Sequence, residues 1–159
     1  MTSRKQAILD RLAESRTYLD QVLDQVGDRW EQQVYSDGLG WTVRQLVAHL
    51  ADAERGHYLQ VTNIAEGKDL IPEDFDVERY NKRVTEKTAD VTPTQAREQL
   101  ATYRQQLNDW LAQLDEAKLD QKGRHASLQI MTVEQILGIL SAHEHTHAAD
   151  IAKALNITL

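Results

Sequence analysis

Apolar residues recur with the period of an α-helix in four long blocks of the chain, separated by polar or glycine-rich stretches. The apolar positions of the blocks are Ile8, Leu12, Leu19, Val22 and Val26; Val43, Leu46, Val47, Leu50, Ala53, Val61 and Ile64; Ala96, Leu100, Tyr103, Leu107, Trp110, Leu111 and Leu114; and Ile136, Leu140, Ile151 and Leu155. Four amphipathic helices bury their apolar stripes most economically by packing as a bundle. The pattern predicts an all-α four-helix bundle, with residues 1–159 forming one domain.

Capping sequences indicate where the four helices begin. A Ser or Thr followed three residues later by Gln forms a capping box, in which both side chains satisfy free backbone N–H groups. This pattern starts at Ser3, Thr42, Thr92 and Thr132. The first helix is expected to end near Gly27, the second near Gly67 and the fourth near Leu155.

Two longer stretches, residues 68–91 and 115–131, connect these helices. The first contains Phe75, Val77 and Tyr80 at a spacing typical of a short helix. It is long enough to reach either end of the bundle. The connection therefore leaves open whether the third helix runs parallel or antiparallel to the second.

Composition and charge narrow the classes of function. The chain contains no cysteine, so a metal site must use histidine, carboxylate or water ligands. The net charge of -7 disfavours a nucleic-acid-binding surface, which needs clustered Lys and Arg. No apolar run reaches the roughly 20 residues of a membrane span, and the N-terminal residues lack the apolar core of a signal peptide. We therefore expect a cytoplasmic protein that binds neither nucleic acid nor membrane.

Two histidines four residues apart, His143 and His147, are the most informative feature of the chain. Residues at this spacing lie on one helix face about one turn apart, and this face is otherwise apolar. An unpaired buried polar group costs roughly 1–3 kcal/mol, so both imidazoles need partners. A divalent metal uses this spacing best, although such pairs also occur with ordinary protein acceptors. His145 falls on the opposite face and is expected to be solvated.

A third ligand is expected from the second helix, where His49 and His57 compete. His49 lies seven residues past the start of its helix, whereas His143 and His147 lie eleven and fifteen residues past the start of theirs. At about 1.5 Å per residue, antiparallel helices place His49 level with the pair, and parallel helices place His57 there. Periodicity alone leaves this choice open. His125, in a connection, is not expected to be a ligand.

Two carboxylates, Glu54 and Glu144, fall on the inward arcs of the same two helices. They are candidates to orient a ligand imidazole as hydrogen-bond acceptors, or to accept a proton during hydrolysis. The alternative is that they are semi-exposed charges at helix seams. Arg79, Tyr80 and Asn81, in the connection before the third helix, either border a cavity or fasten that connection to the bundle.

Three sequence stretches together resemble the DinB/YfiT-like superfamily of metalloenzymes. They are Gly40–Leu50 (GWTVRQLVAHL), Phe75–Asn81 (FDVERYN) and His143–Ile151 (HEHTHAADI), and they span nearly the whole chain in the expected order. The resemblance implies an up-down-down-up four-helix bundle with a long crossover connection between its second and third helices. In that topology the second helix is antiparallel to the fourth, which selects His49 over His57.

The resemblance also implies a function. The family's ligands map onto His49, His143 and His147, which would hold Zn²⁺ or Ni²⁺ and leave a position open for water or substrate. The implied activities on a small-molecule substrate are S-transfer from a low-molecular-weight thiol and hydrolysis by metal-activated water. Many members are homodimers, so the resemblance implies a homodimer here as well. The alternative is a non-catalytic stress-response protein that binds a metal or a small ligand. Ala148–Asp150 replaces a Gly-Gln pair found in several relatives, so the substrate class is not carried over.

Overall fold

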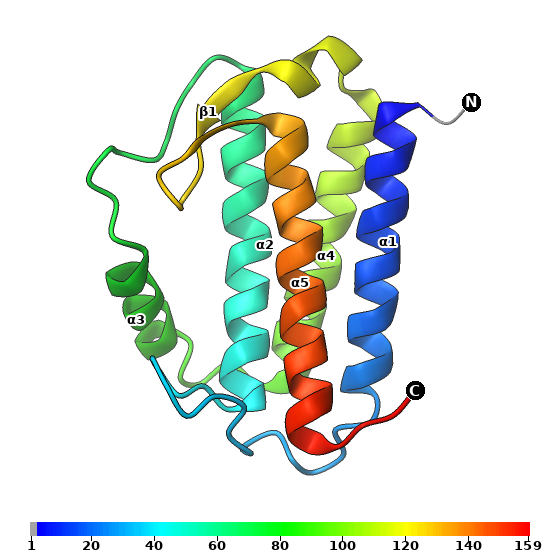
Figure 1. Cartoon of the computed structure of the whole chain (residues 1–159), viewed down its shortest axis with the longest axis vertical. Coiled ribbons are helices and arrows are strands. Elements are labelled where there is room, and N and C mark those ends of the chain that lie inside the picture. Colours follow the sequence, from blue (N-terminus) through cyan, green and yellow to red (C-terminus); the bar gives the residue numbers. More distant parts are fainter. Residues whose placement is uncertain (1–2) are drawn as a thin grey trace.

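The computed structural model describes residues 3–159, which form four long helices, a short helix and a small hairpin (Figure 1). The long helices are α1 (Arg4–Leu23), α2 (Val43–Ala65), α4 (Pro93–Gln113) and α5 (Val133–Leu155). The smaller elements are α3 (Val77–Lys87), the 3-10 helix η1 (Glu116–Asp120), and the antiparallel strands β1 (Lys122–Arg124) and β2 (Ile130–Thr132), in which Gly123 pairs with Met131.

The four long helices form the predicted bundle with an up-down-down-up order. Helices α1 and α5 run in one direction and pack side by side, while α2 and α4 run in the opposite direction (Figure 1). Helix α2 packs against both α4 and α5. The connection that contains α3 returns the chain along the outside of the bundle, so α4 starts at the same end as α2. The expected helix order is confirmed, and α2 is antiparallel to α5.

Capping explains where the helices begin, with one difference from expectation. Thr42, Thr92 and Thr132 form complete capping boxes with the Gln three residues later. At Ser3 the box is half formed. The Gln6 backbone N–H donates to the Ser3 hydroxyl at 3.1 Å, but the Gln6 side chain donates to Asp10 at 2.9 Å. Asp10 lies one turn along the same helix face, where it competes for that amide.

The core is divided into two apolar ends by a polar middle. One end contains Leu19, Val22, Leu46, Leu50, Leu100 and Ile151, and the other contains Ile8, Val61, Ile64, Leu107, Leu111 and Ile136. Between them lie four charged side chains, one from each long helix: Arg16, Glu54, Arg104 and Glu144. We call this group the ionic cluster.

The connection between α4 and α5 is more structured than the sequence indicated, because it forms η1 and the β1–β2 hairpin. The hairpin packs closely on α2 at Gly123. A Cβ atom at that position would lie 2.4 Å from Cγ1 of Ile64, so only glycine fits there. This contact holds the hairpin over one end of α2.

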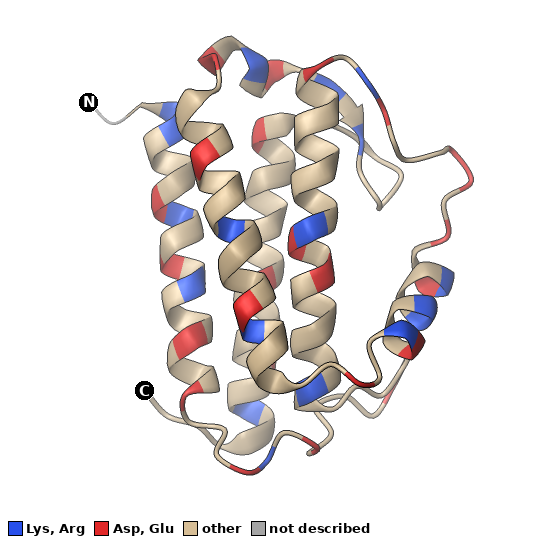
Figure 2. Cartoon of the chain, turned by 180° about the vertical axis from the view of Figure 1, so that it is seen from behind, with Lys and Arg blue, Asp and Glu red and all other residues tan. Residues whose placement is uncertain are grey.

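Acidic and basic residues are interspersed along the helices in the view of Figure 2. Within residues 3–159, no helix is both long and apolar enough to cross a membrane.

Candidate metal centre

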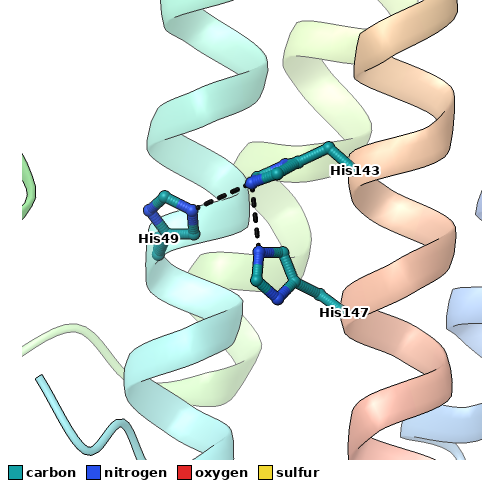
Figure 3. Close-up of side chains that lie close together, drawn as sticks. All are labelled: His49, His143 and His147. Atoms are coloured by element: carbon teal, nitrogen blue, oxygen red, sulfur yellow. Dashed lines mark hydrogen bonds between the residues drawn. The ribbon is translucent and has the colours of Figure 1, made fainter. Parts of the chain in front are cut away.

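Helices α2 and α5 bring His49, His143 and His147 together at one point (Figure 3). Nε2 of His143 lies 3.2 Å from Nε2 of His49 and 3.0 Å from Nε2 of His147. One nitrogen from each ring lies within 4.8 Å of the other two, and no other His, Asp or Glu trio in residues 3–159 has this arrangement. We call these three residues the histidine cluster.

Helix direction selects His49 as the third member. Both α2 and α5 contain 23 residues. Because they are antiparallel, a histidine near the start of α2 faces the second half of α5, where His143 and His147 lie. His57 lies two turns farther along α2 and contacts His125 instead. The choice that periodicity left open is therefore decided by topology.

The cluster lies at the seam between α2 and α5, not at the centre of the bundle. The face of α5 that points to the centre carries Glu144 and Ala148, both buried, whereas His143 and His147 are partly buried. Helix α5 packs against α1 as well as α2. The buried face of α5 is therefore wider than its apolar residues indicated, and His143 and His147 lie toward one edge of that face.

A hydrogen-bond chain behind His147 fixes which of its nitrogens faces the cluster. The Tyr35 hydroxyl lies 2.8 Å from Nδ1 of His147 and donates its proton to the Asp150 carboxylate. The hydroxyl oxygen therefore accepts a hydrogen bond from Nδ1–H of His147, and Nε2 of His147 keeps its lone pair. Burial, together with Asp150, raises the pKa of Tyr35, so this hydroxyl remains protonated at neutral pH.

The three imidazoles are neutral at neutral pH. Burial, reinforced by the neighbouring imidazoles, lowers the pKa of His143 to about 2 and that of His49 to about 3. Burial also lowers the pKa of His147, against the opposing effect of Asp150. Neutral imidazole is the form that binds metal ions, because its unprotonated nitrogen offers a lone pair.

The geometry of the cluster fits a divalent metal ion. Metal–nitrogen bonds of about 2.0–2.1 Å in a tetrahedral site separate ligand nitrogens by about 3.4 Å. Two of the three observed separations, 3.0 and 3.2 Å, are within about 0.4 Å of that value, and the third is no more than 4.8 Å. Nδ1 of His143 is buried and has no hydrogen-bond partner among the described residues. Among the described residues the three Nε2 atoms contact only one another, so the protein supplies them with no other hydrogen-bond partner.

The cluster opens on a cavity of about 530 Å³ between α2, the α3 segment and the hairpin. Trp41 lines the cavity and stacks on His49, with ring centroids 4.4 Å apart. Tyr80 and Asn81 also line it, and Tyr80 donates a hydrogen bond to Asp52 of α2 at 2.8 Å. Both expected roles of this connection are thus present, because it borders the cavity and is fastened to the bundle.

Arg79 lies outside this cavity. It lines an adjacent hollow between α3 and the loop that precedes α2, together with Tyr35 and Trp41. The expectation that Arg79 borders the same cavity as Tyr80 and Asn81 is therefore corrected.

The structure corrects the expected surroundings of Glu54 and Glu144. Both side chains are buried and belong to the ionic cluster, so they are not semi-exposed seam charges. Arg104 donates to Glu54 at 2.9 and 3.0 Å and to Glu144 at 3.0 Å, and Ser15 donates to Glu144 at 2.7 Å. Neither carboxylate bonds to a histidine. Because guanidinium groups occupy their oxygens, these residues cannot orient a ligand imidazole or accept a proton in the cavity.

A second histidine pair, His57 and His125, closes the far end of the cavity. His57 Nδ1 donates to the Ala53 carbonyl at 2.7 Å, and His125 Nδ1 accepts from the Ser127 N–H at 3.1 Å. His125 Nε2–H therefore donates to His57 Nε2, 3.0 Å away. Every ring nitrogen is satisfied, so this pair joins the hairpin to α2 and leaves no nitrogen free for a metal.

Sequence reasoning missed several of these residues and placed others correctly. Asp150 is three residues after His147 on the same helix face, a spacing that could have indicated the contact. Tyr35 belongs to a loop with no helical period, so no sequence signal placed it near the cavity. His145 is exposed, as expected, and stacks on Tyr18.

Comparisons with known proteins agree with this architecture. The family model described as the DinB superfamily matches residues 11–151. YfiT of Bacillus subtilis, which is named as a candidate metal-dependent hydrolase, is 29% identical over 147 residues, covering 89% of this chain and 79% of that protein. The solved structure of YfiT from Bacillus subtilis matches with a TM-score of 0.77 and 24% identity, covering 96% of this chain and 86% of that chain. It is described as having an unusual four-helix bundle topology, and the likeness shows a common fold.

Proposed function

This chain belongs to the DinB superfamily, and we propose that it is a metal-dependent hydrolase whose divalent ion is held by His49, His143 and His147. The observation that carries the proposal is the convergence of three neutral imidazole nitrogens beside a cavity. The hydrolase class is taken from the description of YfiT, its relative in Bacillus subtilis.

The ligand set favours Zn²⁺ or Ni²⁺. Imidazole nitrogen suits these ions, whereas Mg²⁺ and Ca²⁺ prefer oxygen ligands. Three protein ligands leave a coordination position open, which is characteristic of catalytic rather than structural sites. When bound, such an ion supplies a Lewis acid that polarises a carbonyl group and activates water at neutral pH.

The chain's own residues supply orientation and a shielded space for a small-molecule substrate. Tyr35 and Asp150 hold His147 in the tautomer that presents its Nε2 lone pair. Trp41 packs over His49 and restricts the rotation of its ring. The α3 segment and the hairpin border the cavity and restrict its contact with bulk water.

Metal analysis tests the ligand assignment. The purified protein is expected to contain about one equivalent of Zn²⁺ or Ni²⁺ per chain. His49→Ala and His147→Ala should each abolish tight binding, while His145→Ala, on the opposite face of α5, should not. Absence of metal after gentle purification, together with no uptake on titration, would contradict the proposal.

Activity assays test the hydrolase assignment. The metal-loaded protein is expected to hydrolyse a member of a panel of carboxylic esters and amides, and the His147→Ala variant is expected to be inactive on the same compound. Turnover only when a low-molecular-weight thiol and an electrophile are added would identify a transferase instead. One equivalent of metal without turnover in either assay would identify a non-catalytic metal-binding protein.

A further inference from the structure

The cavity beside the histidine cluster has a composition that indicates its substrate. We infer that it takes a neutral, elongated and largely apolar carboxylic ester or amide. This inference rests on the proposed function, because it names the substrate class of the same site. The cavity follows α2 from Trp41 to Gln60, and its volume of about 530 Å³ lies in the usual range for small-molecule sites.

Hydrocarbon forms most of the cavity between its two ends. The apolar side chains that line it are Leu59, Leu70, Ile71, Phe75, Val77 and Ile139. Three of them, Leu59, Leu70 and Val77, are among only seven large hydrophobic side chains exposed in residues 3–159. Exposed apolar side chains that gather around one cavity commonly mark a ligand-binding site. An alkyl or acyl chain lying along α2 would remove these side chains from water.

The lining offers no free positive charge for an anionic substrate. Asp52 and Arg55 are its only charged residues, and they lie 3.6 Å apart as an ion pair. Asp52 also accepts a hydrogen bond from Tyr80. A phosphate or carboxylate group is normally recognised by unpaired Arg or Lys side chains. A neutral ester or amide needs no such partner, and it therefore fits this lining better.

Binding of simple amides tests the apolar part of the inference. Acetamide, hexanamide, octanamide and decanamide are titrated into chelator-treated, metal-free protein, and the backbone amide signals of cavity residues are followed by two-dimensional NMR. Affinity should rise by about two- to fourfold for each added methylene until the cavity is full. Octanamide should bind more tightly than octanoate or octyl phosphate. Affinity independent of chain length, or preference for either anion, overturns the inference.

A matched pair of variants localises the alkyl chain. Leu70→Glu places a charge at the cavity mouth and should weaken octanamide binding by about fivefold or more. Ile130→Glu makes the same kind of change at an exposed strand position outside the cavity, and it should have no effect. Equal affinities for the two variants would contradict binding in this cavity.

These titrations are independent of metal and of turnover. Chain-length-dependent binding by a protein that holds no metal or hydrolyses nothing would therefore support the cavity assignment and contradict only the proposed function. Conversely, a metal-loaded hydrolase that binds no apolar amide would contradict only the cavity assignment.

Discussion

Two buried polar clusters share helices α2 and α5, and they are completed in different ways. In the ionic cluster, two guanidinium groups face two carboxylates, and every hydrogen bond between them is 3.0 Å or shorter. In the histidine cluster, three neutral rings direct their Nε2 atoms at one another, and these atoms have no other hydrogen-bond partner among the described residues. In the ionic cluster the protein's own charges neutralise one another. In the histidine cluster the ring nitrogens are available as ligands for an ion that the chain does not supply.

The two clusters are close in sequence but lie on different helix faces. Glu144 directly follows His143, and one residue turns the helix by about 100°. Glu144 therefore points into the bundle between its apolar ends, while His143 points to the seam and the cavity. Residues on one face of these helices thus stabilise the bundle, and residues on the other face form the proposed binding site. Substitutions on the two faces should therefore affect stability and binding separately.

Removing one member of the ionic cluster should have the largest effect. Glu54→Ala leaves Arg104 buried without its main partner and is expected to lower the free energy of unfolding by about 3–5 kcal/mol. Urea denaturation of the metal-free protein measures this loss. Glu98→Ala, at an exposed position of α4, should change it by less than about 0.5 kcal/mol. A loss below about 1 kcal/mol for Glu54→Ala would contradict the view that this cluster holds the bundle together.

His49→Ala should show the opposite behaviour. In metal-free protein we expect a change in unfolding free energy of less than about 1 kcal/mol, because this ring is only partly buried and contacts other rings at the cavity. Free Zn²⁺ at a thousandfold excess over its Kd should stabilise the wild-type protein by about 4 kcal/mol. This stabilisation should be absent in His49→Ala and retained in His145→Ala, as measured by denaturation with and without Zn²⁺. Equal stabilisation of both variants would place the metal elsewhere.

The fold was predictable from sequence where periodicity and capping agree. The stripes of α2 and α5 and the complete boxes at Thr42 and Thr132 predicted both helices, because these signals depend on neighbours in the chain. Pairing His49 with His143 required helix direction, which periodicity does not contain. The family resemblance supplied it, and the structure confirms that topology.

The ionic cluster and the loop residues of the site were not predictable in this way. Glu54 and Glu144 had the correct inward position, but their partners Arg16 and Arg104 lie on other helices, and sequence spacing carries no information about contacts between helices. Tyr35 reaches His147 from an irregular loop for the same reason. The sequence therefore indicated which positions face inward, but not which of them meet.

Tyr35→Phe sharpens the comparison, because among the described residues His147 is the one histidine of the cluster with a hydrogen-bond partner outside it, and that partner is Tyr35. The substitution keeps the ring and removes the hydroxyl that fixes the His147 tautomer. Loss of such a partner typically lowers metal affinity by about 10–100-fold. Competition with a chelator of known affinity measures this change, and Tyr103→Phe on α4 serves as the control. Unchanged affinity would show that Tyr35 and Asp150 do not orient the ligand.

The smallest expected effect concerns His57, a histidine outside the proposed metal site whose ring nitrogens are both hydrogen-bonded. Burial, with His125, lowers the pKa of His57 from 6.5 to about 4, against the opposing Ala53 carbonyl. Between these values the unfolded chain binds a proton that the folded protein excludes. His57 therefore makes the free energy of unfolding fall as the pH drops from 6.5 towards 4, by about 1 kcal/mol per pH unit.

A variant isolates this contribution. His57→Gln retains an acceptor for His125 Nε2–H but cannot titrate, so the slope of unfolding free energy against pH should decrease by about 1 kcal/mol per pH unit below about pH 6.5. His145→Gln, at an exposed position, should leave the slope unchanged. Urea denaturation of the metal-free proteins at several pH values measures both slopes. A reduced slope with unchanged metal binding would show that the His57–His125 pair contributes to stability and not to metal binding. Identical slopes in the wild type and His57→Gln would contradict a lowered pKa of His57 in the folded protein.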